Sequence, residues 1–265
     1  MPYSKAHYFL LALLVITFLA FWNSYFSIFN AAPLAHHLHG ITATVWILLL
    51  ATQNWFIHNG KLSMHRKIGQ LIFVMTPLLI GAFALVIWNG ATKSVALHPF
   101  YVQFGQALLA FDALLLLTTS LQVYLALKFR SSVRLHSALI LGTLIGLLPP
   151  IVSRLVGKVF SGLAVESLET LYKFGYSLHI GMIVSLLVPV ILYFSYRKQG
   201  WPWLFATAII ALGYLLYATL GQSSVWQSIV FSLTKIHPLI VYLFGFLLGI
   251  ATCYFGWQHG KKLKT

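Results

Sequence analysis

Long apolar runs alternate with short polar links along the whole chain. Each run is roughly twenty residues long, which is the length an α-helix needs to cross a hydrocarbon core. The pattern predicts an all-α polytopic integral membrane helix bundle of about eight transmembrane helices, with seven as the alternative. The predicted spans are 8–29, 38–57, 68–89, 105–127, 137–153, 174–196, 203–220 and 236–257.

Three places between or within these spans carry local signals. The pair Pro149-Pro150 should end or kink the fifth span, because a proline inside a helix removes a hydrogen bond and clashes with the preceding turn. The longest link, 157–173, contains GLAVESLETLYK, a candidate for a short surface helix. The segment GQSSVWQSIVFSLTK before the last span is a second candidate.

Composition agrees with a membrane protein. Hydrophobic residues make up 60% of the 265 residues and charged residues only 8%, whereas a soluble domain carries about a quarter charged residues. We therefore expect a single transmembrane domain over residues 1–265, with no separate soluble domain and with the lipid bilayer as its principal partner.

The formal net charge of +14 raises the question of nucleic acid, but the basic residues form short clusters between apolar runs and no continuous basic face. With the N-terminus inside, about twelve Lys and Arg residues fall on the cytoplasmic side and about five on the other. This bias predicts that both termini are cytoplasmic, and no nucleic-acid partner is expected. The sequence predicts no oligomeric state.

The single cysteine, Cys253, limits the chemistry. A disulfide within the chain, a thiolate metal cluster and a Cys-x-x-Cys redox pair all need more than one cysteine. Candidate chemistry therefore rests on histidine and on carboxylates.

Ionisable residues forced into a bilayer are costly and usually functional. Counting at about 1.5 Å per residue from the basic cytoplasmic flanks places His39 about 28 Å, His179 about 27 Å and Asp112 about 24 Å along their spans. Asp112 is the only acidic residue in any predicted span, which makes it the candidate catalytic or proton-carrying group. The three residues should lie at one level near the outer face.

The second predicted span carries a polar stripe. His36 and His39 share one helical face because positions three apart are neighbours. The face through His39 continues through Trp46 and Gln53, seven residues apart each time, and is expected to look inward.

A second level of histidines lies at the cytoplasmic side, where His65 opens the third predicted span and His136 opens the fifth. One interpretation makes these residues cofactor ligands. The other makes His65-Arg66 an interfacial anchor that binds lipid headgroups or the open carbonyl groups at the end of the second span, with Gln53 as a possible partner.

Two histidine levels at opposite ends of a bundle suit transmembrane electron transfer, because a b-type haem takes two facing imidazoles and two stacked haems form a wire. The cofactor-binding residues would be His39 with His179 outside and His65 with His136 inside. Electrons would come from quinol or a redox partner protein, because the chain has no flavin- or nucleotide-binding motif.

Two resemblances accompany this pattern. The motif HG…W…Q…HR…G resembles that of uncharacterised bacterial multi-pass membrane proteins, which implies a bacterial inner (cytoplasmic) membrane but no activity. The residues of this motif are His39, Gly40, Trp46, Gln53, His65, Arg66 and Gly69. More loosely, Leu135-His136-Ser137 resembles the LHS motif of di-haem cytochrome b proteins of the ascorbate- and ferric-reductase type, which implies haem b.

Two other functions fit the same residues. The first is a metal-dependent enzyme acting on a lipid-like substrate, with Zn or Fe held by His36, His39, His179 and Asp112. The second is a proton-coupled transporter in which Asp112 and His179 carry protons. A rhodopsin-like Schiff base is not expected, because no lysine lies in the middle of a predicted span.

Overall fold

The computed structural model describes residues 2–197 and 200–261, which contain helices and no strand. In this part of the chain seven segments are long and apolar enough to cross a membrane, which confirms the all-α polytopic membrane bundle. They are Leu34–His58, Ile72–Val95, Tyr101–Lys128, Val133–Val159, Lys173–Ser195, Trp201–Gln222 and Pro238–Gly260.

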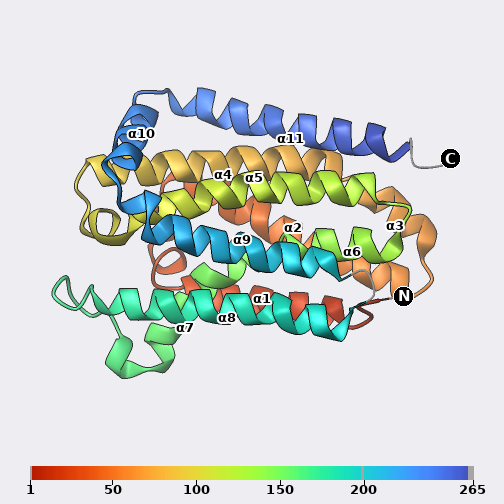
Figure 1. Ribbon diagram of the computed structural model, residues 1–265, viewed down its shortest axis with the longest axis horizontal. Helices are drawn as coiled ribbons and strands as arrows, with labels where there is room; N and C mark the ends of the chain where they lie inside the picture. The colour runs from red at the N-terminus through yellow and green to blue at the C-terminus, as the bar shows by residue number, and fades with distance from the viewer. Residues whose placement is uncertain (1, 198–199, 262–265) are drawn as a thin grey trace. The chain divides into compact units, whose positions relative to one another are not determined.

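Figure 1 shows the α-helices of the described residues in chain order. They are α1 (Ala6–Phe21), α2 (Leu34–His58), α3 (Leu62–Gly69), α4 (Ile72–Val95), α5 (Gln106–Lys128), α6 (Val133–Gly142), α7 (Leu148–Val159), α8 (Lys173–Ser195), α9 (Trp201–Ala218), α10 (Ser224–Thr234) and α11 (Pro238–Lys261). Short 3-10 helices occupy Phe26–Ala31, Ile145–Leu147, Ser161–Leu163 and Leu220–Gln222, and a π-helix occupies Tyr101–Gly105.

The first predicted span, 8–29, is wrong in its extent. Helix α1 has 16 residues, or about 24 Å at 1.5 Å per residue, and it ends at Phe21. The polar pair Asn23-Ser24 follows in a turn, and Ser27 Oγ donates to the carbonyl oxygen of Asn23 at 3.2 Å. The apolar residues beyond this turn form a separate 3-10 helix, so hydropathy alone made the span too long.

The contacts divide the chain into two compact units, each built from several segments. Unit 1 consists of Met1–Phe83, Thr119–Leu144 and Tyr242–Thr265. Unit 2 consists of Ala84–Thr118 and Ile145–Val241. The expectation of a single transmembrane domain over residues 1–265 stays a prediction.

Small residues allow the helices of unit 1 to approach closely. A Cβ atom on Gly249 of α11 would lie 2.9 Å from the backbone nitrogen of Pro77 in α4. A Cβ atom on Gly256 would lie 2.9 Å from the carbonyl oxygen of Tyr124 in α5. Close backbone packing of this kind is the usual way in which helices associate in lipid.

In unit 2, α8 packs against both α7 and α9 (Figure 1). Gly181 of α8 makes the first contact possible, because a Cβ atom there would lie 2.9 Å from the carbonyl oxygen of Pro149. The pair Pro149-Pro150 occupies the first turn of α7, where a missing N–H costs no hydrogen bond. The fifth span is interrupted just before this pair, between Gly142 and Leu148, which confirms the expected break.

The two candidate surface helices have different outcomes. Helix α10 forms as expected, and the Ser223 hydroxyl caps it by accepting from the backbone N–H of Trp226 at 3.2 Å. Between the end of α7 at Val159 and the start of α8 at Lys173, the link forms only a 3-10 helix, bends and turns, so the expectation of a short surface helix there is wrong. Thr170 Oγ1 accepts from the backbone N–H groups of Glu166 and Ser167, both at 2.9 Å, which bends the chain before a helix can form.

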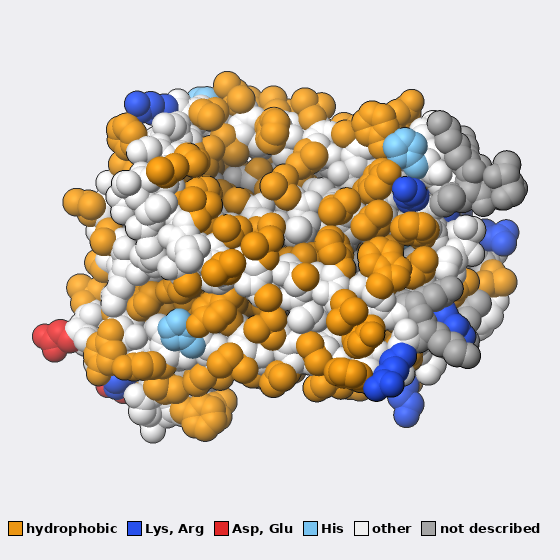
Figure 2. All heavy atoms as spheres, viewed as in Figure 1, with side chains coloured by type: hydrophobic (Ala, Val, Ile, Leu, Met, Phe, Trp, Pro, Cys, Tyr) orange, Lys and Arg blue, Asp and Glu red, His pale blue; other side chains and the backbone are white. Residues whose placement is uncertain are grey.

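Large hydrophobic side chains cover the outward faces of the helices, among them Phe9, Leu204 and Phe244. Figure 2 shows hydrophobic side chains over most of this face of the molecule, with few Lys and Arg side chains. A water-soluble monomer rarely exposes apolar patches of this extent. The surface is suited to contact with a lipid bilayer.

Candidate functional site

Asp112 lies in the second turn of α5, in unit 2, and its side chain is half-buried. The charge of Arg154, on α7, acts on Asp112 at this position. Tyr101, at the start of the π-helix, lies within electrostatic range of both groups. Three separate elements of unit 2 therefore place a carboxyl, a guanidinium and a phenol close together.

The side chain of Arg154 is held against its own helix. Its Nη1 donates to the carbonyl oxygen of Pro150 at 2.9 Å, which uses one of the five guanidinium N–H groups. The Gly181 contact fixes α7 against α8 near the same turn, because Gly181 also lies next to Ser153. The position of the guanidinium thus follows from the packing of two helices.

Tyr101 is positioned from α4. The Ser94 hydroxyl donates to the carbonyl oxygen of Tyr101 at 3.2 Å, and Lys93 Nζ lies 5.5 Å from the centre of the Tyr101 ring. Gly90 leaves space for this ring, because a Cβ atom there would lie 3.2 Å from it. Lys93 and Arg154 give this region of unit 2 more positive than negative charge.

The indole of Trp226 fixes the junction between the π-helix and α5. Its Nε1 donates to the carbonyl oxygen of Gln106 at 2.9 Å. A π-helical turn leaves the backbone locally under-wound, and such turns occur frequently at functional sites. The carboxyl of Asp112 follows two turns after this irregular segment.

His65 and His136, the histidines predicted to lie at the cytoplasmic side, belong to unit 1, and His65 is anchored by Gln53. Two backbone groups fix the orientation of the Gln53 amide. Its oxygen accepts from the N–H of Gly69 at 3.2 Å, and its nitrogen donates to the carbonyl oxygen of His65 at 2.9 Å. The same nitrogen lies 2.7 Å from Nδ1 of His65, so Nδ1 accepts and the proton of the neutral ring is on Nε2.

This hydrogen bond matches the interfacial-anchor interpretation of His65. A histidine that ligates a metal or a haem iron through Nε2 normally donates from Nδ1. In His65, by contrast, Nδ1 accepts a hydrogen bond and Nε2 carries the proton. Burial lowers the pKa of His65, a hydrogen bond with the Gln53 backbone partly opposes this shift, and the charge of Arg66 lowers the pKa further, so the net shift favours the neutral ring.

His136, in α6, has the opposite arrangement. Its Nδ1 donates to the carbonyl oxygen of Ala126 at 2.8 Å, which leaves a lone pair on Nε2 of the neutral ring. His65 and Arg130 both lie within electrostatic range of His136. Unit 1 therefore brings the two inner histidines near each other, but only His136 has the hydrogen bond typical of a ligand.

The polar stripe of α2 looks inward as expected at Trp46, whose side chain is only 2% exposed. Its Nε1 donates to Thr143 Oγ1 at 3.0 Å. Nearer the N-terminal end of α2, the His39 ring lies 5.1 Å from the ring of Phe83, and His36 is within electrostatic range of His39. Nδ1 of His39 is buried and has no hydrogen-bond partner among the described residues.

His179 is exposed on α8, and its Nδ1 is joined to the hydroxyl of Tyr214 on α9 at 2.5 Å. His179 and Asp112 belong to unit 2, whereas His36 and His39 belong to unit 1. Across residues 2–197 and 200–261 no group of three or more His, Cys, Asp or Glu side chains is placed to hold a metal ion. The Zn or Fe site and the outer haem site stay predictions.

Sequence reasoning missed Arg154 and Tyr101. Arg154 lies one residue beyond the predicted span 137–153 and was interpreted as part of the outer flank. The apolar residues Leu155, Val156 and Val159 after it were the available signal, because they carry the helix on to Val159. No comparable signal marks Tyr101, since a π-helical turn has no recognisable sequence pattern.

The His65 anchor predicts a pH effect on stability. The folded pKa lies below the value of about 6.5 in an unfolded chain, so the unfolded chain takes up the proton first as the pH falls. The stability that neutral His65 contributes is therefore present above about pH 6.5 and is lost below it. Between about pH 7.5 and about pH 5.5, thermal unfolding in detergent should show a smaller fall in Tm for His65→Gln than for the unmodified protein.

His259→Gln is the matched control, because His259 is an exposed histidine of the same unit. This variant should keep the fall in Tm of the unmodified protein. Equal falls in all three proteins would contradict the assignment.

Comparison with protein-family models, with curated proteins and with solved structures finds no match to this chain. Its function is therefore argued from the geometry of Asp112, Arg154 and the histidines.

Proposed function

We propose that this protein is a proton-coupled membrane transporter of small organic anions, with Asp112 as the proton carrier and Arg154 as the anion-binding group. One observation carries the proposal. The only acidic residue in the membrane-spanning segments lies within electrostatic range of an arginine from a different helix of the same unit.

A half-buried carboxylate and a half-buried guanidinium within a membrane-spanning segment each cost free energy, and each lowers the cost of the other. The pair is therefore stable while both groups are charged. Once Asp112 takes up a proton, Arg154 loses the counter-charge that Asp112 supplied. A carboxylate or phosphate-like anion is the natural replacement, because the planar guanidinium binds such groups through paired N–H donors.

These alternatives give a coupling mechanism. When Asp112 is deprotonated, its carboxylate pairs with the guanidinium of Arg154 and excludes the anion. Protonated Asp112 releases Arg154, and the anion binds, so proton and anion enter together with no net change of charge at the site. The nearby Lys93 adds positive charge that favours an anionic substrate over a cationic one.

Two irregular helices support movement at this site. The π-helix Tyr101–Gly105 precedes α5, and the 3-10 helix Ile145–Leu147 precedes α7. Discontinuous helices are common around the substrate sites of transporters, where they free backbone groups and allow one half of a helix to tilt. Asp112 and Arg154 each follow one of these interruptions.

Reconstituted vesicles with a pH-sensitive dye inside test the proposal. Addition of carboxylates from a panel should acidify the vesicle interior. Asp112→Asn should abolish proton uptake but keep anion exchange, because asparagine resembles the protonated carboxyl and leaves Arg154 available. Glu166→Gln, which removes an exposed carboxylate from a loop, should behave like the unmodified protein.

Two results would contradict this mechanism. One is proton uptake that persists in Asp112→Asn. The other is the absence of any anion in the panel that drives proton entry.

Haem binding is the second candidate, and the observation that favours it is the hydrogen bond from Nδ1 of His136 to Ala126, which places a lone pair on Nε2 of the neutral ring. Nδ1 of His39 is buried and has no partner among the described residues, so it lacks the hydrogen bond that a haem-ligating histidine normally makes. Bound haem would supply one-electron redox chemistry, with quinol or a redox protein as the electron source. His65 fits it poorly, because Gln53 donates to its Nδ1.

Absorbance of the purified protein separates the two candidates. A Soret band that shifts on dithionite reduction and disappears in His136→Ala would favour the redox protein. A colourless protein that couples protons to anions would favour the transporter. In either case we propose a bacterial inner membrane location with both termini in the cytoplasm, as the charge bias predicts.

A further inference from the structure

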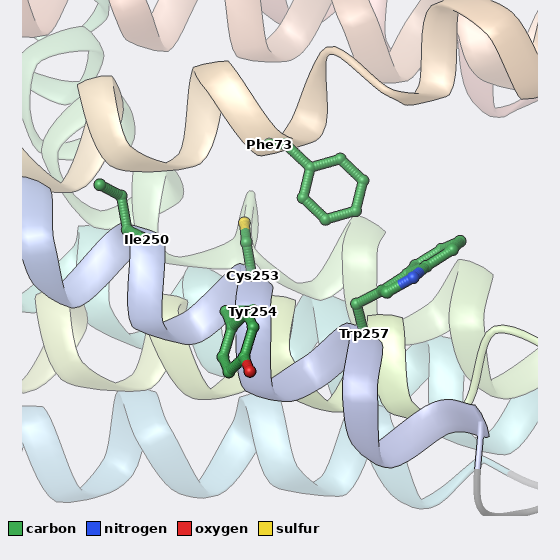
Figure 3. A pocket seen from close by; sticks show the side chains of 5 residues that line it. All are labelled: Phe73, Ile250, Cys253, Tyr254 and Trp257. Atoms are coloured by element: carbon green, nitrogen blue, oxygen red, sulfur yellow. The ribbon is translucent and has the colours of Figure 1, made fainter.

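A small groove opens on the lipid-facing side of unit 1, between the first turn of α4 and the C-terminal half of α11. Its volume is about 260 Å³, and Figure 3 shows its five lining side chains. They are Phe73, Ile250, Cys253, Tyr254 and Trp257. None of them is charged, so the groove suits a hydrocarbon chain.

The groove has a buried floor and aromatic sides. Cys253 is only 3% exposed, and its thiol faces the carbonyl oxygen of Ile72 at 3.7 Å. The rings of Phe73 and Trp257 meet edge to face with centres 5.6 Å apart. Ile250 and Tyr254 remain exposed along α11. From Ile250 to the end of α11 is about 16 Å at 1.5 Å per residue, which matches one leaflet of a bilayer.

A cation is fixed at the Trp257 end of the groove. The guanidinium of Arg130 lies 4.0 Å from the centre of the Trp257 ring. Its Nη1 donates to the carbonyl oxygens of Leu127 and Trp257, at 2.9 and 3.0 Å. Gly260 leaves the space that the guanidinium occupies, because any Cβ atom there would collide with it.

Charge complementarity indicates the occupant. All three acidic residues of the chain, Asp112, Glu166 and Glu169, fall in unit 2, so unit 1 has no acidic side chain. The positive charge of Arg130 therefore has no acidic side chain as a partner within its unit. An anionic lipid headgroup can supply the missing charge, and basic sites between helices at the cytoplasmic side of a membrane commonly bind such headgroups.

We propose that this groove binds an anionic phospholipid, with one acyl chain along Phe73 and Trp257 and the phosphate group paired with Arg130. The site lies in the leaflet that the charge bias predicts to be cytoplasmic. It is independent of the proposed transport function, because no group of the Asp112 region takes part. The bound lipid would stabilise the packing of α11 against α4.

Native mass spectrometry of the full chain in detergent tests this site with two lipids of identical acyl chains, phosphatidylglycerol and phosphatidylcholine. Phosphatidylglycerol should bind roughly fivefold more tightly, as expected for one cation beside a headgroup of net negative charge, because the choline cation of phosphatidylcholine offsets its phosphate. Arg130→Gln should remove this preference, and Arg130→Lys should keep most of it. Arg197→Gln is the matched control, because Arg197 also lies over an aromatic ring, that of Phe194, at 5.3 Å, but in unit 2.

A second variant tests the acyl-chain part without touching the charge. Ile250 is exposed, so Ile250→Trp should fold normally while filling the groove. It should weaken the binding of both lipids. Equal affinity for the two lipids in the unmodified protein, the same loss of preference in Arg130→Gln and Arg197→Gln, or unchanged binding in Ile250→Trp would each overturn the proposal.

Discussion

Replacing Arg154 by leucine is expected to lower the free energy of unfolding by about 1–3 kcal/mol, because it leaves the half-buried carboxyl of Asp112 without the charge of Arg154. The change also removes the Arg154 donor to the carbonyl oxygen of Pro150, but that oxygen still accepts from the Ser153 hydroxyl at 3.4 Å. Most of the loss should therefore be electrostatic. Titration with a denaturing detergent in mixed micelles measures it.

A double variant separates charge from packing. Asp112→Asn together with Arg154→Leu removes both charges, so it should be more stable than Arg154→Leu alone by more than half of the loss. Lys158→Leu, which removes an exposed cation one turn further along α7, should change the stability by less than about 1 kcal/mol. If Arg154→Leu and Lys158→Leu are equally stable, Asp112 and Arg154 do not act as a pair.

The membrane-spanning segments could be predicted from the sequence because their signal is local. Twenty apolar residues in a row can satisfy their backbone groups in lipid only as a helix, whatever surrounds them. The prediction of the first span was too long because the same signal is an average over about twenty positions. The turn at Asn23-Ser24 depends on two polar residues, and an average over twenty positions hides them.

The candidate site was only partly predictable, because it depends on which helices meet. Depth along a span identified Asp112 as an exceptional residue, but depth says nothing about its neighbour. Arg154 becomes that neighbour through the packing of α7, which the sequence pattern does not encode. The tautomer of His65 is a further example, since it follows from the backbone groups that orient Gln53.

The inward direction of the α2 stripe could be predicted, because a tryptophan in mid-span has no interfacial role there. Trp46 is 2% exposed, and its indole N–H donates to Thr143 in the same unit. The sequence could not supply this acceptor, which lies 97 residues away in the chain.

Trp46→Ala is expected to lower the free energy of unfolding by about 3 kcal/mol, near the lower end for a buried tryptophan, because lipid lessens the hydrophobic part of the cost but not the lost packing. Trp46→Phe should cost only about 1 kcal/mol, since it keeps most of the ring volume and loses one hydrogen bond. Thr143 Oγ1 still donates to the carbonyl oxygen of Ile140 at 2.7 Å, so the hydroxyl is not left without a partner. Trp22→Ala is the control, because Trp22 is 47% exposed, and it should change stability by less than about 0.5 kcal/mol. A loss in Trp46→Ala no larger than that in Trp22→Ala would mean that the α2 stripe does not hold unit 1 together.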